Sequence, residues 1–317
     1  MSPKTTGSEL PSTFGGPGWS QRAGSHAEEV AAGQLWTTCG YRSETAPLRA
    51  VLLAWPPDSF AEITRYEEQL MVGPVDLAAM RAQTETIAET CRRNGVEVHL
   101  TRPAASPNVV FMRDLFFMTP EGALIARTAS QQRAGEERHA AAALAQAGYP
   151  ILRTVAGTAT FEGADALWID ETTVLVGTGF RTNAGGAQAV REVLAPQGVR
   201  VLTTPLRPGV QHLLGTVMFV DERLAAVHAA ACGPELRALL REHGHELIEV
   251  PADDELLVAR GMNMLVLGPR RLIMPSRAPA IRRRLEAAGV EVQELEIGEY
   301  VRAAGGLACL TGILRRG

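Results

Sequence analysis

The run Phe116 to Arg127 (FFMTPEGALIAR) recurs in pattern three more times along the chain. It consists of an apolar run of strand length, a turn with proline, glutamate and glycine, and a second apolar run, which is typical of a β-hairpin. The other copies are Ala166 to Thr178 (ALWIDETTVLVGT), Val217 to His228 (VMFVDERLAAVH) and Met264 to Ser276 (MLVLGPRRLIMPS). An internal repeat of this kind predicts a fold built from similar units.

Each hairpin is followed by an amphipathic stretch that stops near a glycine and by another apolar run, which indicates a helix and a third strand. The predicted helix ends are Gly148, Gly198, Gly244 and Gly289, and the strands after them are Tyr149–Thr154, Val199–Thr203, His245–Val250 and Val290–Leu295. A fifth unit has strand Leu48–Trp55, helix Asp76–Arg93 and strand Val96–Leu100 but no hairpin partner nearby. The C-terminal run Cys309–Leu314 can supply the missing strand.

These units carry three strands per helix, whereas an ordinary doubly wound α/β sheet alternates one strand with one helix. We therefore expect an α/β fold of the five-bladed propeller type, made of ββαβ repeats with pseudo-fivefold symmetry and closed by the N- and C-terminal strands. Residues 37–317 are expected to form this single catalytic domain. Residues 1–36, rich in small and polar residues at their start, are expected to be a flexible tail.

Composition favours a small-molecule substrate. The 317 residues carry 31 basic and 35 acidic side chains, a net charge of −4, without a basic cluster, so neither nucleic acid nor membrane is expected as a partner. Lys4 is the only lysine, which excludes Schiff-base and P-loop lysine chemistry. Without an apolar span or signal segment, we expect a cytoplasmic chain, with a homodimer as an open alternative to a monomer.

The sequence predicts neither a metal site nor a cofactor. The four cysteines (Cys39, Cys91, Cys232 and Cys309) are scattered singly, which fits reduced thiols rather than a zinc cage or disulfides. His243 and His245 form the only close histidine pair, and a solvated turn explains them more simply than a metal site.

Polar residues collect at one place in the repeats, the loop that enters the first strand of each hairpin. In a closed ring these equivalent positions point to the same end of the axis, so they can meet in one pocket. They are Asn108, Arg113, Asp114, Glu162, Asp165, His212, Asn263 and Cys309.

A thiol, an imidazole and several carboxylates together suit nucleophilic attack on a cationic electrophile. Carboxylates beside a thiolate would raise its pKa, so we interpret them as partners of a substrate guanidinium. Each residue alone also has a structural explanation: Cys309 as a small core residue, His212 as a structural histidine, and Glu162 or Asp165 as loop caps. Their recurrence at equivalent positions favours a site.

These motifs resemble the superfamily of arginine deiminases, dimethylargininases and arginine amidinotransferases, whose fold is a five-bladed α/β propeller of the pentein type. The resemblance spans about Leu48 to Leu314 and rests on the segments that begin at Asn108 (NVVFMRD), Phe161 (FEGAD), His212 (HL) and Gly305 (GGLACLT). It implies Cys309, His212 and Glu162 as catalytic residues. It further implies substrate binding by Asp114, Asp165, Asn108, Phe60, Leu214, Arg133 and Arg181, the two arginines as ligands of a substrate α-carboxylate.

Three departures limit the transfer. Ala164 replaces a glycine, Ala308 precedes the nucleophile, and Leu214 stands where deiminases and amidinotransferases place a second aspartate. Dimethylargininases also lack that aspartate, so the pattern is closest to theirs. An apolar residue there favours an N-substituted guanidinium over unsubstituted arginine.

We therefore expect a cysteine-dependent hydrolase that converts an arginine derivative into citrulline and an amine through a covalent thiouronium. An amidinotransferase and an arginine deiminase are the alternatives within the superfamily, because they share the first half-reaction. A propeller that only binds its ligand is an alternative from another class.

Overall fold

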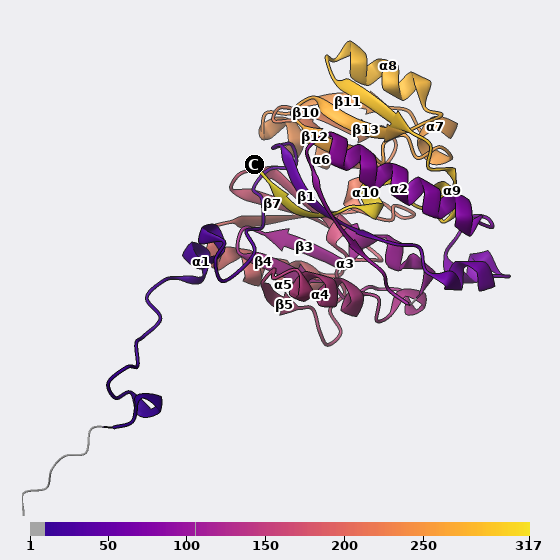
Figure 1. Ribbon diagram of the computed structural model, residues 1–317. Helices are drawn as coiled ribbons and strands as arrows, with labels where there is room; N and C mark the ends of the chain where they lie inside the picture. The colour runs from indigo at the N-terminus through magenta and orange to yellow at the C-terminus, as the bar shows by residue number, and fades with distance from the viewer. Residues whose placement is uncertain (1–9, 105) are drawn as a thin grey trace, which may run out of the picture.

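The computed structural model describes residues 10–104 and 106–317, which form five three-stranded sheets. Figure 1 shows the chain from its N-terminal segment to the C-terminal strand. The strands are β1 (Leu48–Ala54), β2 (Glu97–Thr101), β3 (Phe116–Thr119), β4 (Gly122–Ile125), β5 (Ile151–Thr154), β6 (Ala166–Asp170), β7 (Thr173–Thr178), β8 (Arg200–Pro205), β9 (Val217–Asp221), β10 (Leu224–His228), β11 (Glu246–Val250), β12 (Leu265–Gly268), β13 (Arg271–Pro275), β14 (Glu291–Leu295) and β15 (Gly312–Arg316).

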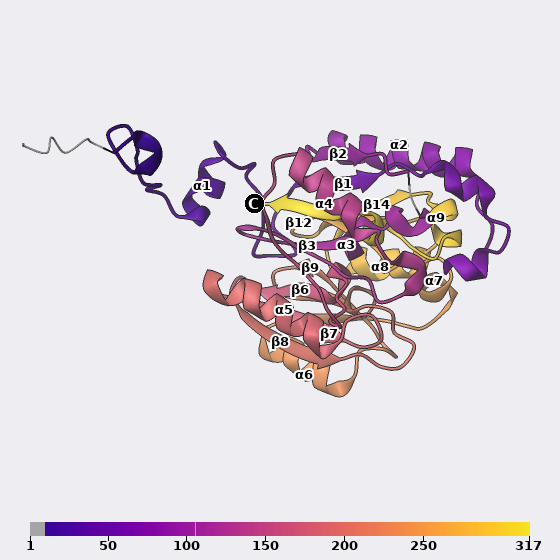
Figure 2. The ribbon, with the colours of Figure 1, turned by 90° about the horizontal axis from the view of Figure 1, so that it is seen from below.

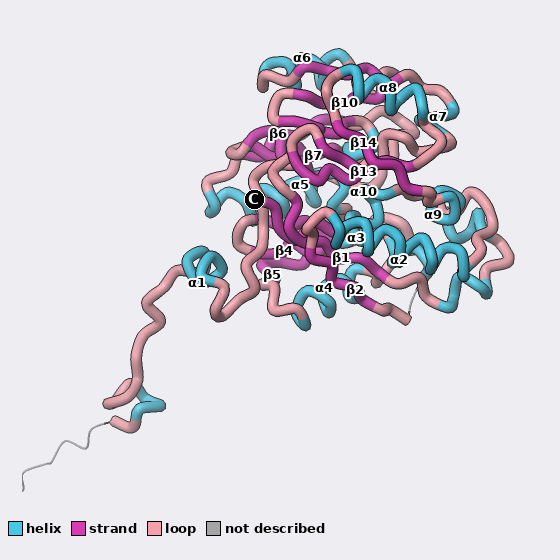
Figure 3. The backbone as a smooth tube through the Cα atoms, turned by 45° about the horizontal axis from the view of Figure 1, so that its top comes forward, coloured by secondary structure: helices cyan, strands magenta, loops and turns pink. Residues whose placement is uncertain are grey.

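Helices connect or flank the strands, and α6 and α8 lie at one edge of the molecule (Figure 3). Seen from below, α2 and α6 lie on opposite sides (Figure 2). The α-helices are α1 (His26–Ala32), α2 (Leu77–Arg93), α3 (Met112–Leu115), α4 (Glu137–Gln146), α5 (Ala184–Leu194), α6 (Pro234–Glu242), α7 (Asp254–Leu257), α8 (Pro279–Ala287), α9 (Gly298–Arg302) and α10 (Leu307–Leu310). None of these described helices is long and apolar enough to cross a membrane.

All five sheets share one topology: the central strand pairs antiparallel with one neighbour and parallel with the other. In the sheet β3-β4-β5, for example, Phe116 faces Ile125 across the hairpin, and Ala123 faces Ile151 on the parallel strand after α4. The four hairpins and the third strands expected from the repeats are confirmed, with strand ends that differ by one or two residues at most sites.

The predicted helix ends are also where the chain leaves the helices. The glycines after α2, α4, α6 and α8, and after the turn that follows α5, have left-handed backbone angles, for example φ 76° at Gly95 and 84° at Gly244. At the start of α2, Asp76 accepts a hydrogen bond from the Ala79 N–H at 3.0 Å, which caps the first turn.

The C-terminal strand completes the fifth sheet, as expected, because β15 pairs antiparallel with β1. Its bounds were predicted wrongly: Cys309 lies in the short helix α10, and the strand begins at Gly312. The four residues Leu307–Leu310 are all apolar or small, and a stretch this short shows no hydrophobic period by which a helical turn could be distinguished from a strand. The result places Cys309 in the turn before the strand rather than within it.

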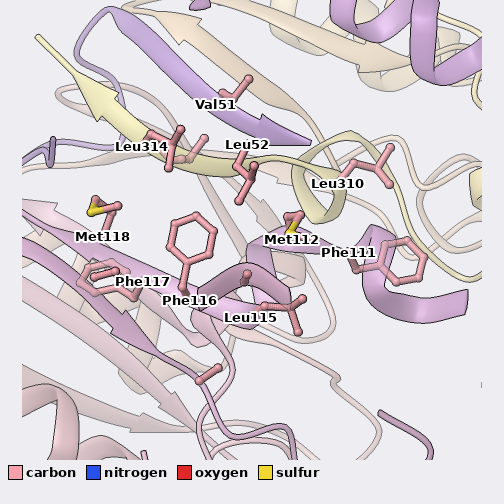
Figure 4. Close-up of a cluster of buried hydrophobic side chains, with 14 of the residues drawn as sticks. Val51, Leu52, Phe111, Met112, Leu115, Phe116, Phe117, Met118, Leu310 and Leu314 are labelled. Carbon is pink, nitrogen blue, oxygen red and sulfur yellow. The ribbon is translucent and has the colours of Figure 1, made fainter. Parts of the chain in front are cut away.

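Neighbouring sheets meet through their first strands or the turns before them. β15 contacts β3, β12 contacts both β1 and β9, and the turns η6 (Gly163–Asp165) and η8 (Leu213–Gly215) link the sheets that contain β3, β6 and β9. Figure 4 shows part of the core, where side chains of β1, β3, β15 and α3 gather, among them Leu52, Phe116 and Leu314. These residues are at most 2% exposed.

Residues 10–24 extend away from the body, and α1 lies against it (Figure 1). His26 bonds to the Glu121 carbonyl through Nε2 at 2.8 Å, and Val30 is buried in the core cluster. The tail expected at residues 1–36 falls partly outside the described residues, and its mobility stays a prediction. His245, expected in a solvated turn, is only 5% exposed and bonds to the Ile169 carbonyl, which corrects that interpretation.

Candidate active site

Each of the five sheets contributes one polar residue from the segment before its first strand. Asp114 lies in α3, Glu162 and His212 directly precede η6 and η8, and Cys309 lies in α10. Asn263 precedes β12 by two residues. The structure therefore brings together residues that are almost two hundred positions apart in the chain.

The contact between these segments explains one glycine of the FEGAD motif. A Cβ atom at Gly163 would lie 2.2 Å from the Phe116 carbonyl oxygen and 2.5 Å from that of Arg113. Only a residue without a side chain permits this approach, so the glycine sets how closely Glu162 comes to Asp114. Ala164, the departure from the family pattern, is fully buried and fits there.

His212 is held between two buried carboxylates. Its Nε2 lies 2.8 Å from Glu162 Oε2, and its Nδ1 lies 3.8 Å from Asp114 Oδ1. The exposed fractions are 0% for Glu162, 2% for Asp114 and 6% for His212, so these charges interact with little screening by water. The imidazole is therefore oriented by hydrogen bonding and held close to negative charge.

Protonated His212 is the favoured form at neutral pH. Burial lowers the pKa of His212, but Asp114, Asp165 and Glu162 outweigh burial and raise it to about 9. For Glu162, burial raises the pKa, because it disfavours the charged carboxylate. The hydrogen bond and charge of His212, together with the charges of Arg133 and Arg181, outweigh burial and hold the pKa of Glu162 well below its usual value. An imidazolium–carboxylate pair can donate a proton to a leaving group.

Cys309 and His212 line the same pocket, which has a volume of about 340 Å³. Leu214, Met262 and Leu256 supply apolar walls, and Arg260 and Asn263 supply polar ones. Burial and then the Asp114 carboxylate raise the pKa of the Cys309 thiol, so the surroundings oppose its ionisation. A cationic ligand next to the sulfur would favour the thiolate.

Both predicted arginines face carboxylates. Arg133 bonds to Asp114 Oδ2 through Nη1 at 2.6 Å and to Glu136 Oε2 through Nε at 2.8 Å, and its Nη1 lies 3.6 Å from Glu162. Arg181 donates to Glu162 at 3.3 Å and keeps a buried Nε–H without a partner in the described chain. Three buried carboxylates require counter-cations, which Arg133 supplies here. Binding of a substrate carboxylate by these arginines stays a prediction.

The other predicted ligands have structural contacts. Asp165 accepts hydrogen bonds from Thr182 Oγ1 at 2.6 Å and from the Leu213 N–H at 2.9 Å, so it fixes the backbone beside His212. Burial raises its pKa to about 6. Asn108 donates to the Gln69 carbonyl at 2.8 Å. Phe60 is 3% exposed and does not line the pocket.

Asp114 Oδ1 is a buried acceptor without a hydrogen-bond partner among the described residues. Such an atom is costly unless a ligand supplies a donor. Ligand atoms of Asp114, Glu162 and His212 lie within 4.8 Å of one another, a spacing that a metal ion could also use. Because Arg133 already bonds to Asp114 and lies beside Glu162, a cationic donor group fits the free oxygen better than a divalent ion does.

Two further residues belong to this site although the sequence analysis gave them no role. Glu136 holds Arg133, and Asn263 bonds to Cys309. The sequence analysis grouped Asn263 with Glu162 and His212 by its position in the repeat, but the repeat does not indicate its bond to Cys309. Glu136 carries no such signal, because it precedes α4 rather than a first strand.

The raised pKa of His212 predicts how stability depends on pH. The folded value of about 9 exceeds the ordinary histidine pKa of 6.5, so His212 contributes stability fully below about pH 6.5 and loses it as pH rises through about 9. At 1.36 kcal/mol per pKa unit, the contribution is about 3 kcal/mol. We expect the difference in unfolding free energy between wild type and His212→Asn to shrink by that order between pH 6 and pH 10, measured by urea unfolding. A constant difference would show that folding does not raise the pKa of His212.

Comparison with known proteins gives consistent matches. A model of the arginine deiminase family matches residues 58–203 and 220–316. The N(G),N(G)-dimethylarginine dimethylaminohydrolase of Streptomyces coelicolor is 28% identical over 272 residues, which cover 85% of this chain and 98% of that protein. The structure resembles DDAH from Pseudomonas aeruginosa complexed with citrulline, with a TM-score of 0.68 and 20% identity, covering 84% and 98% of the two chains. An amidinotransferase from Microseira wollei gives a TM-score of 0.68 at 15% identity, covering 88% and 97%.

Proposed function

This chain belongs to the arginine deiminase family, and from that premise we propose that it hydrolyses the guanidino group of an N-substituted arginine, with Cys309 as nucleophile. The observation that carries the proposal is the free Asp114 Oδ1 beside His212, which shares a pocket with Cys309. A guanidinium N–H would satisfy this oxygen, and its charge would stabilise the thiolate. The similarity to a dimethylarginine dimethylaminohydrolase supports the same substrate class.

In the first half-reaction the Cys309 thiolate attacks the central guanidinium carbon, and a C–S bond forms. The C–N bond to the substituted nitrogen then breaks, and His212 gives its proton to the departing amine. A thiouronium adduct on Cys309 and a neutral imidazole remain. The pKa of about 9 for His212 suits this step, because the imidazole is protonated before the reaction.

In the second half-reaction neutral His212 takes a proton from water, and the resulting hydroxide adds to the same carbon. The hydroxyl group of this adduct loses its proton to solvent as the C–S bond breaks, which regenerates the thiolate and releases the ureido product, citrulline for an arginine derivative. Glu162 stabilises the imidazolium that reforms, through its 2.8 Å contact with Nε2. His212 therefore gives one proton to the amine and takes one from water, and the thiol proton of Cys309 leaves to solvent when the cationic substrate binds.

Substrate binding must rearrange the contacts of Arg133. Its guanidinium lies against Asp114 and Glu162, the two carboxylates that we assign to the substrate guanidinium. Asp114 Oδ1 is already free, and a shift of Arg133 that keeps its bond to Glu136 would also free Asp114 Oδ2 for the substrate. The unpartnered Nε–H of Arg181 supports a carboxylate-bearing substrate, hence an amino acid.

We also propose that the five sheets close as the blades of a five-bladed propeller. The contacts between the sheets support this arrangement, because they lead from β15 to β3, on through the turns and β9 to β12, and from β12 back to β1 in the sheet of β15. A ring would place all five polar residues at one end of its axis, where the pocket of Cys309 opens.

Leu214 is expected to set the substrate preference. It is 4% exposed and lines the pocket with Cys309 and His212. Each methyl group of a dimethylated substrate that packs against Leu214 would gain roughly 0.8 kcal/mol of binding free energy. The N–H donors of unsubstituted arginine would instead lose their hydrogen bonds to water there. We expect kcat/KM for Nω,Nω-dimethylarginine to exceed that for arginine by at least about tenfold.

Steady-state kinetics on both compounds tests this preference, with agmatine as a third substrate that lacks the carboxylate and should be poorer. Leu214→Asp should shift the preference toward arginine, since a carboxylate can pair with the free N–H donors. Leu214→Ala is the matched control, and it should weaken the preference without reversing it. A wild-type enzyme that prefers arginine over every substituted analogue would contradict the assignment.

A further inference from the structure

Asn263 bonds to Cys309 through both ends of its side-chain amide. Oδ1 accepts a hydrogen bond from the backbone N–H of Cys309 at 3.1 Å, and Nδ2 donates to the Cys309 Sγ at 2.9 Å. Because a backbone N–H can only donate, the oxygen of the amide must face it. The NH₂ group therefore faces the sulfur, and the orientation of Asn263 is fixed by its own contacts.

Two local features hold Asn263 in this position. Its N–H donates to the Arg260 carbonyl at 2.8 Å, in a turn where Arg260 has a left-handed φ of 57°. On the other side, a Cβ atom at Gly306 would lie 2.6 Å from the Asn263 Cβ and 2.7 Å from its Cγ. Only glycine at position 306 lets the chain before Cys309 approach Asn263 so closely.

The sulfur needs such a donor because its surroundings otherwise oppose ionisation. Burial and the Asp114 carboxylate raise the pKa of the Cys309 thiol, while the hydrogen bond from Asn263 and the charge of Arg260 act in the opposite direction. Lys4 is the only lysine of the chain, so no ammonium group is available near the pocket from the rest of the sequence. A hydrogen bond to a charged acceptor is stronger than one to a neutral acceptor.

We propose that Asn263 is a catalytic residue, whose Nδ2–H stabilises the Cys309 thiolate when it forms and whose Oδ1 fixes the Cys309 backbone for attack. The inference deepens the proposed function, because it rests on Cys309 as the nucleophile. With Asn263, the sheet that contains β12 also contributes a residue to the site. Asp114, Glu162 and His212 come from three other sheets.

Alkylation of Cys309 by iodoacetamide tests the proposal without any guanidino substrate. The alkylation rate follows the thiolate fraction, so its dependence on pH reports the thiol pKa. Asn263→Asp keeps the size and the acceptor for the backbone N–H but places a carboxylate oxygen against the sulfur. We expect its rate at pH 7.5 to fall at least about tenfold, as for the loss of a hydrogen bond to a charged group, and the midpoint of the profile to move to higher pH.

Asn263→Ala removes both contacts and lets water in, so its rate should fall by a smaller factor, about threefold or more. Asn94→Asp is the matched control: Asn94 bonds to Gln293 far from Cys309, and its variant should keep the wild-type profile. Mass spectrometry of peptides assigns the adduct to Cys309. Circular dichroism establishes that each variant is folded, and Asn263→Ala carries the test if Asn263→Asp does not fold.

Wild-type profiles in the folded Asn263 variants would overturn the proposal. With a confirmed substrate, both variants should lose kcat while KM stays within about threefold, because the thiolate is needed for attack rather than for binding. Failure of the proposed function looks different. In that case wild type would release no citrulline, yet the alkylation profiles would still separate the variants.

Discussion

Replacing Cys309 by alanine is expected to reduce kcat for Nω,Nω-dimethylarginine by about 10⁴-fold or more, because no other group in the pocket can form the covalent adduct. The fold should persist, since a small residue replaces a small residue at a half-buried position. Circular dichroism and thermal unfolding, together with release of citrulline, measure both parts of the prediction.

Cys91→Ala is the matched control for this substitution. Cys91 lies in α2, is fully buried and has no contact with the pocket, so its variant should keep near wild-type turnover and lose only some stability. Turnover by Cys309→Ala at the wild-type rate would remove Cys309 from the mechanism.

Glu162→Gln is expected to have the second largest effect. The carboxylate is 0% exposed and contacts His212, Arg133 and Arg181, so its removal leaves His212 and Arg181 without their main partner and reduces the negative charge beside Arg133. Breaking a buried ion pair on one side costs about 3–5 kcal/mol. The pKa of His212 should also fall toward its ordinary value, which weakens proton donation, and kcat should drop by about 10²–10⁴-fold.

Glu136→Gln separates the loss of charge from the loss of contact with His212. Glu136 is also buried and also bonds to Arg133, but it does not contact His212. Its variant should lose stability while the pKa of His212, followed by NMR titration, stays near 9. Equal effects of both substitutions on kcat would show that the negative charge beside Arg133, and not the contact with His212, determines kcat.

The repeat is readable from the sequence because each buried hairpin needs apolar runs of strand length with turn residues between them. This reasoning also identified the partner of β1, since Leu48–Ala54 has no hairpin partner of its own and β15 supplies one. It failed for Cys309, whose helical turn has no distinguishing period. Whether the sheets close into a ring, the mobility of the tail, the homodimer and the cytoplasmic location stay predictions.

The position of the site follows from equivalent places in the repeats, which is why Asp114, Glu162 and His212 could be grouped from the sequence. The contacts of Arg133 could not be foreseen, because a long side chain turns toward whichever carboxylates the fold brings near it. The two bonds of Asn263 depend on the close approach of Gly306, a distance that no sequence pattern specifies. The sequence therefore predicts which residues form the site more reliably than it predicts which of them bond to one another.

Product analysis with Nω,Nω-dimethylarginine tests the central claim most directly. The purified full-length enzyme is incubated with the compound in water without an added amine, and both products are quantified by mass spectrometry. Hydrolysis at the guanidino carbon predicts citrulline and dimethylamine in equal amounts. Release of ornithine only when an acceptor amine is present would instead identify an amidinotransferase, and no turnover by the folded enzyme would contradict the account.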